Sequence, residues 1–238
     1  MIAAHGKKSV NSVLRGINAY LHWSSGSERK CGAGCTHPRM QPLKEPRDVL
    51  PTFTEAQIQK LIAWKPQGHC QRRLHLLILL LMDTGCRVSE ALNVRIEDID
   101  LDNLLVTLNE KGRKQRIVPF SREMRKALFR YCQTTLEHLL FASRTGMGLN
   151  RHNISRDVRL LCHKLGFAPP ARTVHAFRHT FALNYLRRGG SVFHLQKMLG
   201  HSTLEMTRRY ASLQTEDLQA VHQKVSLLVP WLKKINPS

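Results

Sequence analysis

The segment RRLHLLILLLMDTGCRVSEALNV, residues 72–94, contains an unbroken apolar run from Leu76 to Met82. A helix on a protein surface confines its apolar residues to one stripe, whereas this run places them all around the helix. We therefore expect a helix that is buried at the centre of a globular domain. The run is too short for a bilayer, which needs about 20 apolar residues, so no membrane partner is expected.

The hydrophobic pattern changes between Val94 and Phe120. Three short segments rich in β-favouring residues, VRIEDID, NLLVTLNE and KQRIVPF, are separated by the turn sequences DLDN and KGRK. They predict a small antiparallel sheet of three strands. Helical periodicity covers most of the remaining sequence, including residues 54–64 and 121–139. The expected fold class is α+β, mainly α-helical.

The N-terminal part has a different composition. Residues 9–23 predict one amphipathic helix, which cannot bury its apolar stripe alone. Residues 24–50 are rich in Ser, Gly, Pro and charged residues and predict a linker. At the other end, residues 216–231 predict a further amphipathic helix, which would pack either on its own domain or on a neighbouring protomer.

Charge indicates the class of partner. Lys and Arg number 37 and Asp and Glu 17, for a net charge of +20, and the basic residues are spread from Lys7 to Lys234. Such a field attracts polyanions, and its spread favours duplex DNA over a ribosomal or membrane-surface partner. The N-terminus has no signal-peptide pattern, and six cysteines make no dense disulfide framework. We expect a cytosolic protein with reduced thiols.

Cys31, Cys35 and His37 have the spacing of three zinc ligands. No fourth ligand follows at a zinc-finger distance, so no metal is expected.

Several residues suit phosphate chemistry. His175 and Arg178 are three apart and share one face of a predicted helix, although a solvated face would look the same. Gly200 is a helix stop that fixes His201 in the following turn. Tyr210 follows two arginines, and nearby positive charge favours the phenolate form of a nucleophilic tyrosine.

Two more basic residues have suggestive positions upstream. Arg87 opens a helix just after a turn, where the helix N-terminus adds partial positive charge. Lys111 lies beside Gly112 in a predicted hairpin turn, from which it would reach into a groove. In a chain this basic, each is also compatible with a plain exposed cation.

Taken in order, TGCRVSEAL, EKGRKQRIVPF, HAFRHTFA and LGHSTLEMTRRY resemble the tyrosine recombinase (phage integrase) family over about residues 50–215. The resemblance implies an integrase-type catalytic domain. It marks as catalytic Arg87, Lys111, His175, Arg178, His201 and Tyr210. Nearby basic residues expected to bind DNA are Arg113, Lys114, Arg116, Arg151, Arg156 and Arg172; His179 and His194 are expected to be structural.

The resemblance also implies roles for these residues. Arg87 and Arg178 would clamp the scissile phosphate, and Tyr210 would attack it to leave a 3′-phosphotyrosyl bond. Lys111 would protonate the leaving 5′ oxygen and His175 would assist proton transfer at the tyrosine. His201 would donate a hydrogen bond to the phosphate. Neither a cofactor nor a metal is expected.

The implied function is site-specific recombination of double-stranded DNA by a homotetramer, in the cytoplasm and in association with the nucleoid. Two alternatives stay open: a truncated remnant that binds DNA without completing recombination, and a relaxing activity like that of type IB topoisomerases. The resemblance assigns residues 49–238 to the catalytic domain and residues 1–48 to a linker and a one-helix remnant of an N-terminal domain. A truncated gene, a late annotated start and a minimal recombinase would each explain that remnant.

Overall fold

The computed structural model describes residues 7–25, 39–43, 50–109, 115–135, 137–143, 145–201 and 203–211. The chain divides into two compact units, Met1–Val49 and Leu50–Ser238. The predicted zinc ligands Cys31, Cys35 and His37, and the predicted C-terminal helix at residues 216–231, lie outside the described residues.

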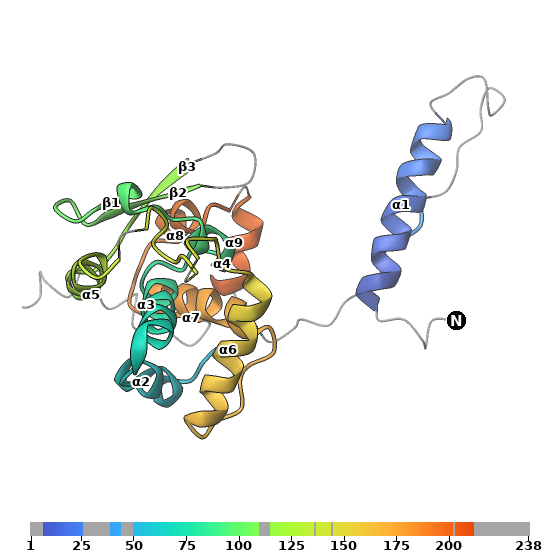
Figure 1. Cartoon of the computed structure of the whole chain (residues 1–238). Helices are drawn as coiled ribbons and strands as arrows, with labels where there is room; N and C mark the ends of the chain where they lie inside the picture. Colours follow the sequence, from blue (N-terminus) through green and yellow to red (C-terminus); the bar gives the residue numbers. More distant parts are fainter. Residues whose placement is uncertain are drawn as a thin grey trace, which may run out of the picture. The chain divides into compact units, whose positions relative to one another are not determined.

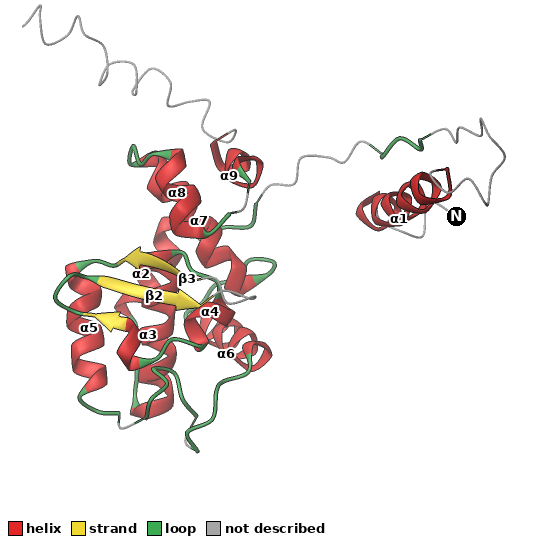
Figure 2. Ribbon diagram, turned by 90° about the horizontal axis from the view of Figure 1, so that it is seen from above, coloured by secondary structure: helices red, strands yellow, loops and turns green. Residues whose placement is uncertain are grey.

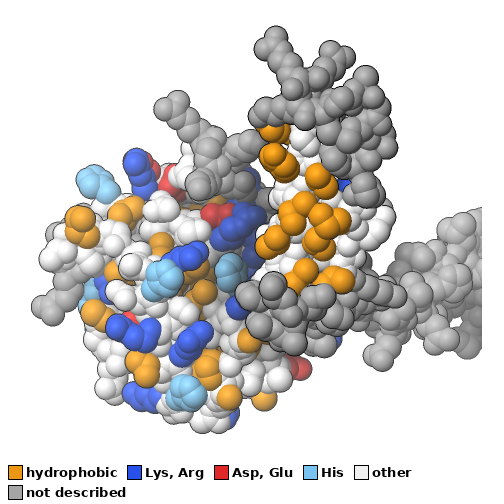
Figure 3. Space-filling model, turned by 90° about the vertical axis from the view of Figure 1, so that its right-hand side faces the viewer, with side chains coloured by type: hydrophobic (Ala, Val, Ile, Leu, Met, Phe, Trp, Pro, Cys, Tyr) orange, Lys and Arg blue, Asp and Glu red, His pale blue; other side chains and the backbone are white. Residues whose placement is uncertain are grey.

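The first unit contains helix α1 (Lys7–Ser25). Two of its asparagines hold the neighbouring segment 39–43 through reciprocal bonds to the backbone. Asn11 accepts from the Leu43 amide at 2.7 Å and donates to the Leu43 carbonyl at 2.9 Å, and Asn18 pairs with Met40 in the same way. Apolar side chains remain exposed along α1, as Figure 3 shows; they are Val13, Ile17, Tyr20 and Trp23.

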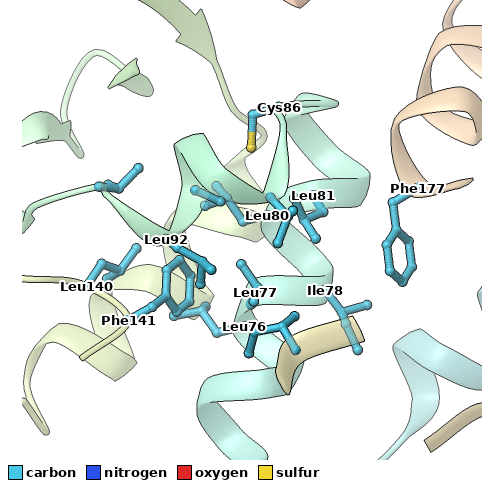
Figure 4. Packing of buried hydrophobic residues seen from close by; sticks show 14 of the residues in the cluster. Leu76, Leu77, Ile78, Leu80, Leu81, Cys86, Leu92, Leu140, Phe141 and Phe177 are labelled. Carbon is cyan, nitrogen blue, oxygen red and sulfur yellow. The ribbon is translucent and has the colours of Figure 1, made fainter. Parts of the chain in front are cut away.

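The second unit is built around helix α3 (Gly68–Thr84), as the apolar run predicts. This helix packs against α2 (Glu55–Ala63), α4 (Val88–Leu92), α5 (Arg122–Cys132) and α7 (Thr173–Arg187) (Figure 1). Leucines of the run meet side chains from distant parts of the chain in one core, including Leu140, Phe141 and Phe177 (Figure 4). Burial on all sides explains why the run lacks polar residues.

A three-stranded antiparallel sheet lies at one end of this helical body (Figures 1 and 2). Its order is β1 (Ile99–Asp100), β2 (Leu105–Asn109), β3 (Gln115–Pro119), with Val106 opposite both Ile99 and Val118. The sheet and the helical content confirm the predicted fold class. The first strand is shorter than its sequence predicts, because Asp98 accepts from the Arg95 amide and closes a 3₁₀ turn at Ile96–Asp98.

The helix predicted over residues 121–139 also ends early. Ser121 caps the start of α5 through its hydroxyl, but the helix stops at Cys132. Beyond it, the Leu140 amide donates to the Val94 carbonyl and the Ile96 amide donates to the His138 carbonyl. These long-range backbone bonds are incompatible with continued helix.

The remaining helices are α6 (Arg151–Lys164), α8 (Val192–Leu199) and α9 (Leu204–Ala211). With α7 they complete the helical body beside the sheet (Figure 2). No helix in the described part of the chain is long and apolar enough to cross a membrane. Lys, Arg and His side chains outnumber acidic ones on the face in Figure 3, consistent with the net charge.

Candidate active site

A glycine turn between α3 and α4 forms the floor of the candidate site. Gly85 ends α3 in the left-handed conformation, with φ of 64°. A β-carbon at this position would lie 2.2 Å from Cδ1 of Phe181, so both the backbone and the packing require glycine. The turn directs the Gly85 carbonyl toward α7 and leaves Arg87 at the N-cap of α4, as the sequence predicts.

Arg178 of α7 lies at the centre of the cluster, with only 6% of its surface exposed. Its Nη1 donates to the Gly85 carbonyl at 3.0 Å and its Nη2 donates to the Leu199 carbonyl at 2.5 Å. Burial, and then repulsion from Arg87, lower the pKa of Arg178 to about 10, which still leaves it protonated at neutral pH. Two carbonyls therefore fix a buried cation and use two of its five N–H groups.

Glu90 links two further arginines to this cluster. Its carboxylate is 5% exposed and accepts from Arg87 Nη1 at 2.6 Å and from the Arg87 amide at 2.8 Å. It also accepts from both terminal nitrogens of Arg116, at 2.7 and 3.1 Å. Burial by itself would raise the pKa of Glu90, but the hydrogen bonds from Arg116 and Arg87 outweigh it, so the pKa lies below its usual value.

Arg116 turns inward from β3. Besides its fork to Glu90, its Nε donates to the Met198 carbonyl at 2.9 Å, near the end of α8. The side chain is 11% exposed. Arg116 thus joins the sheet, α4 and α8. Its guanidinium already binds Glu90, and its contact with DNA remains a prediction.

Tyr210 of α9 enters the same region from the other side. The residue is 4% exposed and packs in a small apolar cluster with Ala182, Leu195 and Leu199. Its ring is nearly parallel to that of His201, with 6.3 Å between the ring centroids. A negative charge on Tyr210 would stabilise the Arg178 cation, so the phenol and the guanidinium interact electrostatically.

The Tyr210 hydroxyl hydrogen-bonds Nδ1 of His179, with 2.8 Å between the oxygen and the nitrogen. This contact differs from the structural role expected of His179. On α7, His175, Arg178 and His179 share one helix face, but it is His179 that meets α9. The sequence could have pointed to His179 only through its helical spacing from His175. It could not show the contact with Tyr210, because Tyr210 lies 31 residues further along the chain.

The two predicted catalytic histidines are held neutral at pH 7. Burial, and then repulsion from Arg178, lower the pKa of His201 to about 4, and its Nδ1 pairs with Thr207 Oγ1 at 2.9 Å. His175 is more exposed, at the first turn of α7. Burial and repulsion from Arg172 lower the pKa of His175 as well.

The remaining predicted residues fall into two groups. Lys111, Arg113 and Lys114 lie outside the described residues, between the end of β2 and the start of β3. Arg151, Arg156 and Arg172 are exposed: Arg156 pairs with Asp157, while Arg151 and Arg172 act electrostatically on His175. Arg172 also has a left-handed backbone, with φ of 56°, which is unusual for a residue with a β-carbon.

An open polar hollow of about 1070 Å³ adjoins the cluster, lined by residues of α4, by the 3₁₀ turn at Ile96–Asp98 and by the ends of β2 and β3. Arg87, one-third exposed, and Glu90 lie in its wall with Asn109 and Gln115. Among the described residues, no group of three or more His, Cys, Asp and Glu side chains is arranged to hold a metal ion.

Residues 51–217 match the phage integrase family. The chain belongs to that family. Sequence similarity to relatives of this family covers almost the whole chain. Tyrosine recombinase XerA of Thermococcus kodakarensis is 29% identical over 230 residues, covering 94% of this chain and 77% of that protein.

Solved integrase-type structures share the fold. The crystal structure of XerA recombinase has a TM-score of 0.64 at 30% identity, covering 78% of this chain and 67% of that one. The Tn1549 transposon integrase, solved with transposon right end DNA, has a TM-score of 0.72 at 20% identity, covering 92% and 79%. At that identity the second likeness concerns the fold alone.

Gly85→Ala should destabilise this integrase-family domain more than Gly166→Ala does. Both glycines have positive φ, 64° and 77°, so each alanine carries a backbone cost of about 1 to 2 kcal/mol. Only at Gly85 does the new β-carbon meet a ring, that of Phe181, which adds about 1 to 3 kcal/mol. Urea unfolding of both variants measures the difference, and equal losses would contradict the close contact between position 85 and the Phe181 ring.

Acidification should weaken the folded state through His201. The pKa of this group is about 4 when folded against an ordinary 6.5, so the unfolded chain binds its proton first. This contribution to stability is full above pH 6.5 and is lost as the pH falls toward about 4. The free energy of unfolding, measured from about pH 7 to about pH 5, should fall less steeply in His201→Asn than in the wild type. Equal slopes would show that His201 titrates normally.

Proposed function

We propose that this integrase-family chain is a tyrosine-type site-specific recombinase, which cleaves and rejoins duplex DNA with Tyr210 as the nucleophile. One observation carries the proposal: buried Tyr210 packs in one cluster with Leu199, whose carbonyl, together with that of Gly85, holds the buried cation of Arg178. The relatives named as tyrosine recombinases support the same activity.

The arginines would bind the scissile phosphate. A phosphodiester under attack gathers negative charge on its two non-bridging oxygens, and guanidinium forks match that geometry. Two carbonyls use two of the five N–H groups of Arg178, so the others would bind the phosphate, and Arg87 lines the polar hollow. Glu90 keeps Arg87 in place before DNA arrives, so little reorganisation would be needed.

The reaction would exchange one phosphoester for another. The Tyr210 oxygen attacks phosphorus in line, the bond to the 5′ oxygen breaks, and a 3′-phosphotyrosyl bond remains. Lys111 would give its proton to the leaving 5′ oxygen. Because the ester bond is preserved on the protein, rejoining requires no ATP.

The histidines would complete the phosphate site. The imidazole of His201, neutral at pH 7 and fixed at Nδ1 by Thr207, would donate to a phosphate oxygen through Nε2. His175, on which Arg172 and Arg151 act electrostatically, would assist proton transfer at Tyr210, as the family resemblance implies. Further contacts are proposed for Arg113, Lys114, Arg116 and Arg156.

The partner would be double-stranded DNA, on which four protomers assemble at two paired sites. The protein would act in the cytoplasm, associated with the nucleoid. Residues 49–238 would form the catalytic domain, and residues 1–48 would contribute one helix of an N-terminal domain and a linker. The predicted helix at residues 216–231 would pack either on its own domain or on a neighbour.

Covalent trapping tests this function. A duplex nicked close to the cleavage site loses the short fragment after cleavage, so the adduct accumulates. Purified protein should convert such a duplex into a species that resists denaturing electrophoresis. A protein that only binds DNA would give no adduct, and relaxation of supercoils by single protomers would favour the topoisomerase-like alternative.

A further inference from the structure

The contact between His179 and Tyr210 is not used by the proposed reaction. A buried phenol donates a hydrogen bond to a strong acceptor that lies close enough. Nδ1 of His179 lies 2.8 Å from the Tyr210 oxygen. The rings are tilted, with 5.8 Å between their centroids, so the contact runs through the polar atoms rather than through stacking.

The other imidazoles are differently engaged. His201 stacks on the Tyr210 ring and directs its Nδ1 to Thr207. His175 is exposed at the first turn of α7, one turn before His179. His179 is therefore the imidazole whose nitrogen meets the nucleophilic oxygen in the described structure.

We propose that His179 is the general base of the reaction, the residue that takes the proton from Tyr210 as it attacks the DNA phosphate. This inference rests on the proposed function. It transfers to His179 the part in proton transfer that the family resemblance implies for His175.

With the His179 proton on Nε2, Nδ1 accepts the Tyr210 proton and the ring becomes an imidazolium. The Tyr210 oxygen bonds to phosphorus, and the 5′ oxygen leaves with a proton from Lys111. On rejoining, the 5′ hydroxyl returns its proton to Lys111 and attacks phosphorus, and the Tyr210 oxygen leaves with the proton of His179. The bound phosphate supplies negative charge that stabilises the transient cation.

Asparagine at position 179 separates proton transfer from positioning, because its amide oxygen takes the place of Nδ1 as an acceptor but does not take up a proton. His179→Asn should slow single-turnover adduct formation by about 10²-fold or more, while DNA affinity stays unchanged. The matched control is His194→Asn, on an exposed position of α8, which should cleave at the wild-type rate.

Chemical rescue decides the role. A difluorotyrosine at position 210 has a more acidic phenol and needs no base, so it should restore most of the rate to His179→Asn. Free imidazole should likewise restore His179→Ala. A substrate with sulfur in place of the 5′ bridging oxygen needs no acid, so it should rescue Lys111→Ala and leave His179→Asn slow.

Three results would overturn the assignment. They are cleavage by His179→Asn within about threefold of wild type, a defect that neither difluorotyrosine nor imidazole relieves, and a defect that the sulfur substrate removes. Should the wild-type protein itself form no adduct, the proposed function fails and this inference with it. An adduct from wild type with an undiminished His179→Asn rate would refute the base assignment alone.

Discussion

Phenylalanine in place of Tyr210 should abolish the covalent DNA adduct completely, because the ring then carries no oxygen to attack phosphorus. The fold should survive the change. The ring keeps its packing against Leu195 and Leu199, and the lost hydrogen bond to His179 costs about 1 kcal/mol. Denaturing electrophoresis of a nicked duplex incubated with each protein measures the adduct.

The matched control is Tyr185→Phe. Tyr185 also lies in the second unit, on α7, where its ring packs against Phe181. This variant should form the adduct as the wild type does. Residual adduct in Tyr210→Phe, or its loss in Tyr185→Phe alone, would mean that another side chain is the nucleophile.

Arg178→Ala should lower the cleavage rate by about 10³-fold, since in the proposed reaction its N–H donors would stabilise charge at the phosphate in the transition state. DNA affinity should fall by less than about tenfold, because a contact made mainly in the transition state contributes little to ground-state binding. The side chain is also buried, so it adds little to the field that attracts DNA at long range. Single-turnover cleavage and equilibrium binding of the same duplex give the two values.

A lysine at position 178 tests the geometry. Arg178→Lys keeps the positive charge but lacks the planar guanidinium fork of arginine. The lysine therefore cannot bind the carbonyls of Gly85 and Leu199 and a phosphate at the same time. It should recover only a small part of the lost rate. Equal losses of binding and cleavage in Arg178→Ala, with lysine restoring both, would reduce Arg178 to a general DNA contact.

The sequence allowed the local setting of several site residues to be predicted. Gly200 does end a helix in the left-handed conformation directly before His201, and Arg87 does stand at the N-cap of a short helix. Such features depend on neighbouring residues, whose preferences are visible in the sequence. The central helix followed from its apolar run in the same way.

Partners across the fold were not predictable in this way. Arg116 reaches Glu90 across 26 residues and His179 reaches Tyr210 across 31. Only the packing of β3, α4, α7 and α9 brings these side chains together. The premature end of α5 has the same origin, because the backbone bonds that replace the helix join residues more than 40 positions apart.

The most direct test of the account is the chemical identity of the residue joined to DNA. Because Arg209 precedes Tyr210, trypsin should release from the adduct a peptide that begins at Tyr210 and carries the nucleotide remnant left by nuclease. Mass spectrometry should place that remnant on the Tyr210 oxygen through a 3′ phosphate. A remnant on any other side chain, or one joined through a 5′ phosphate, would contradict the account.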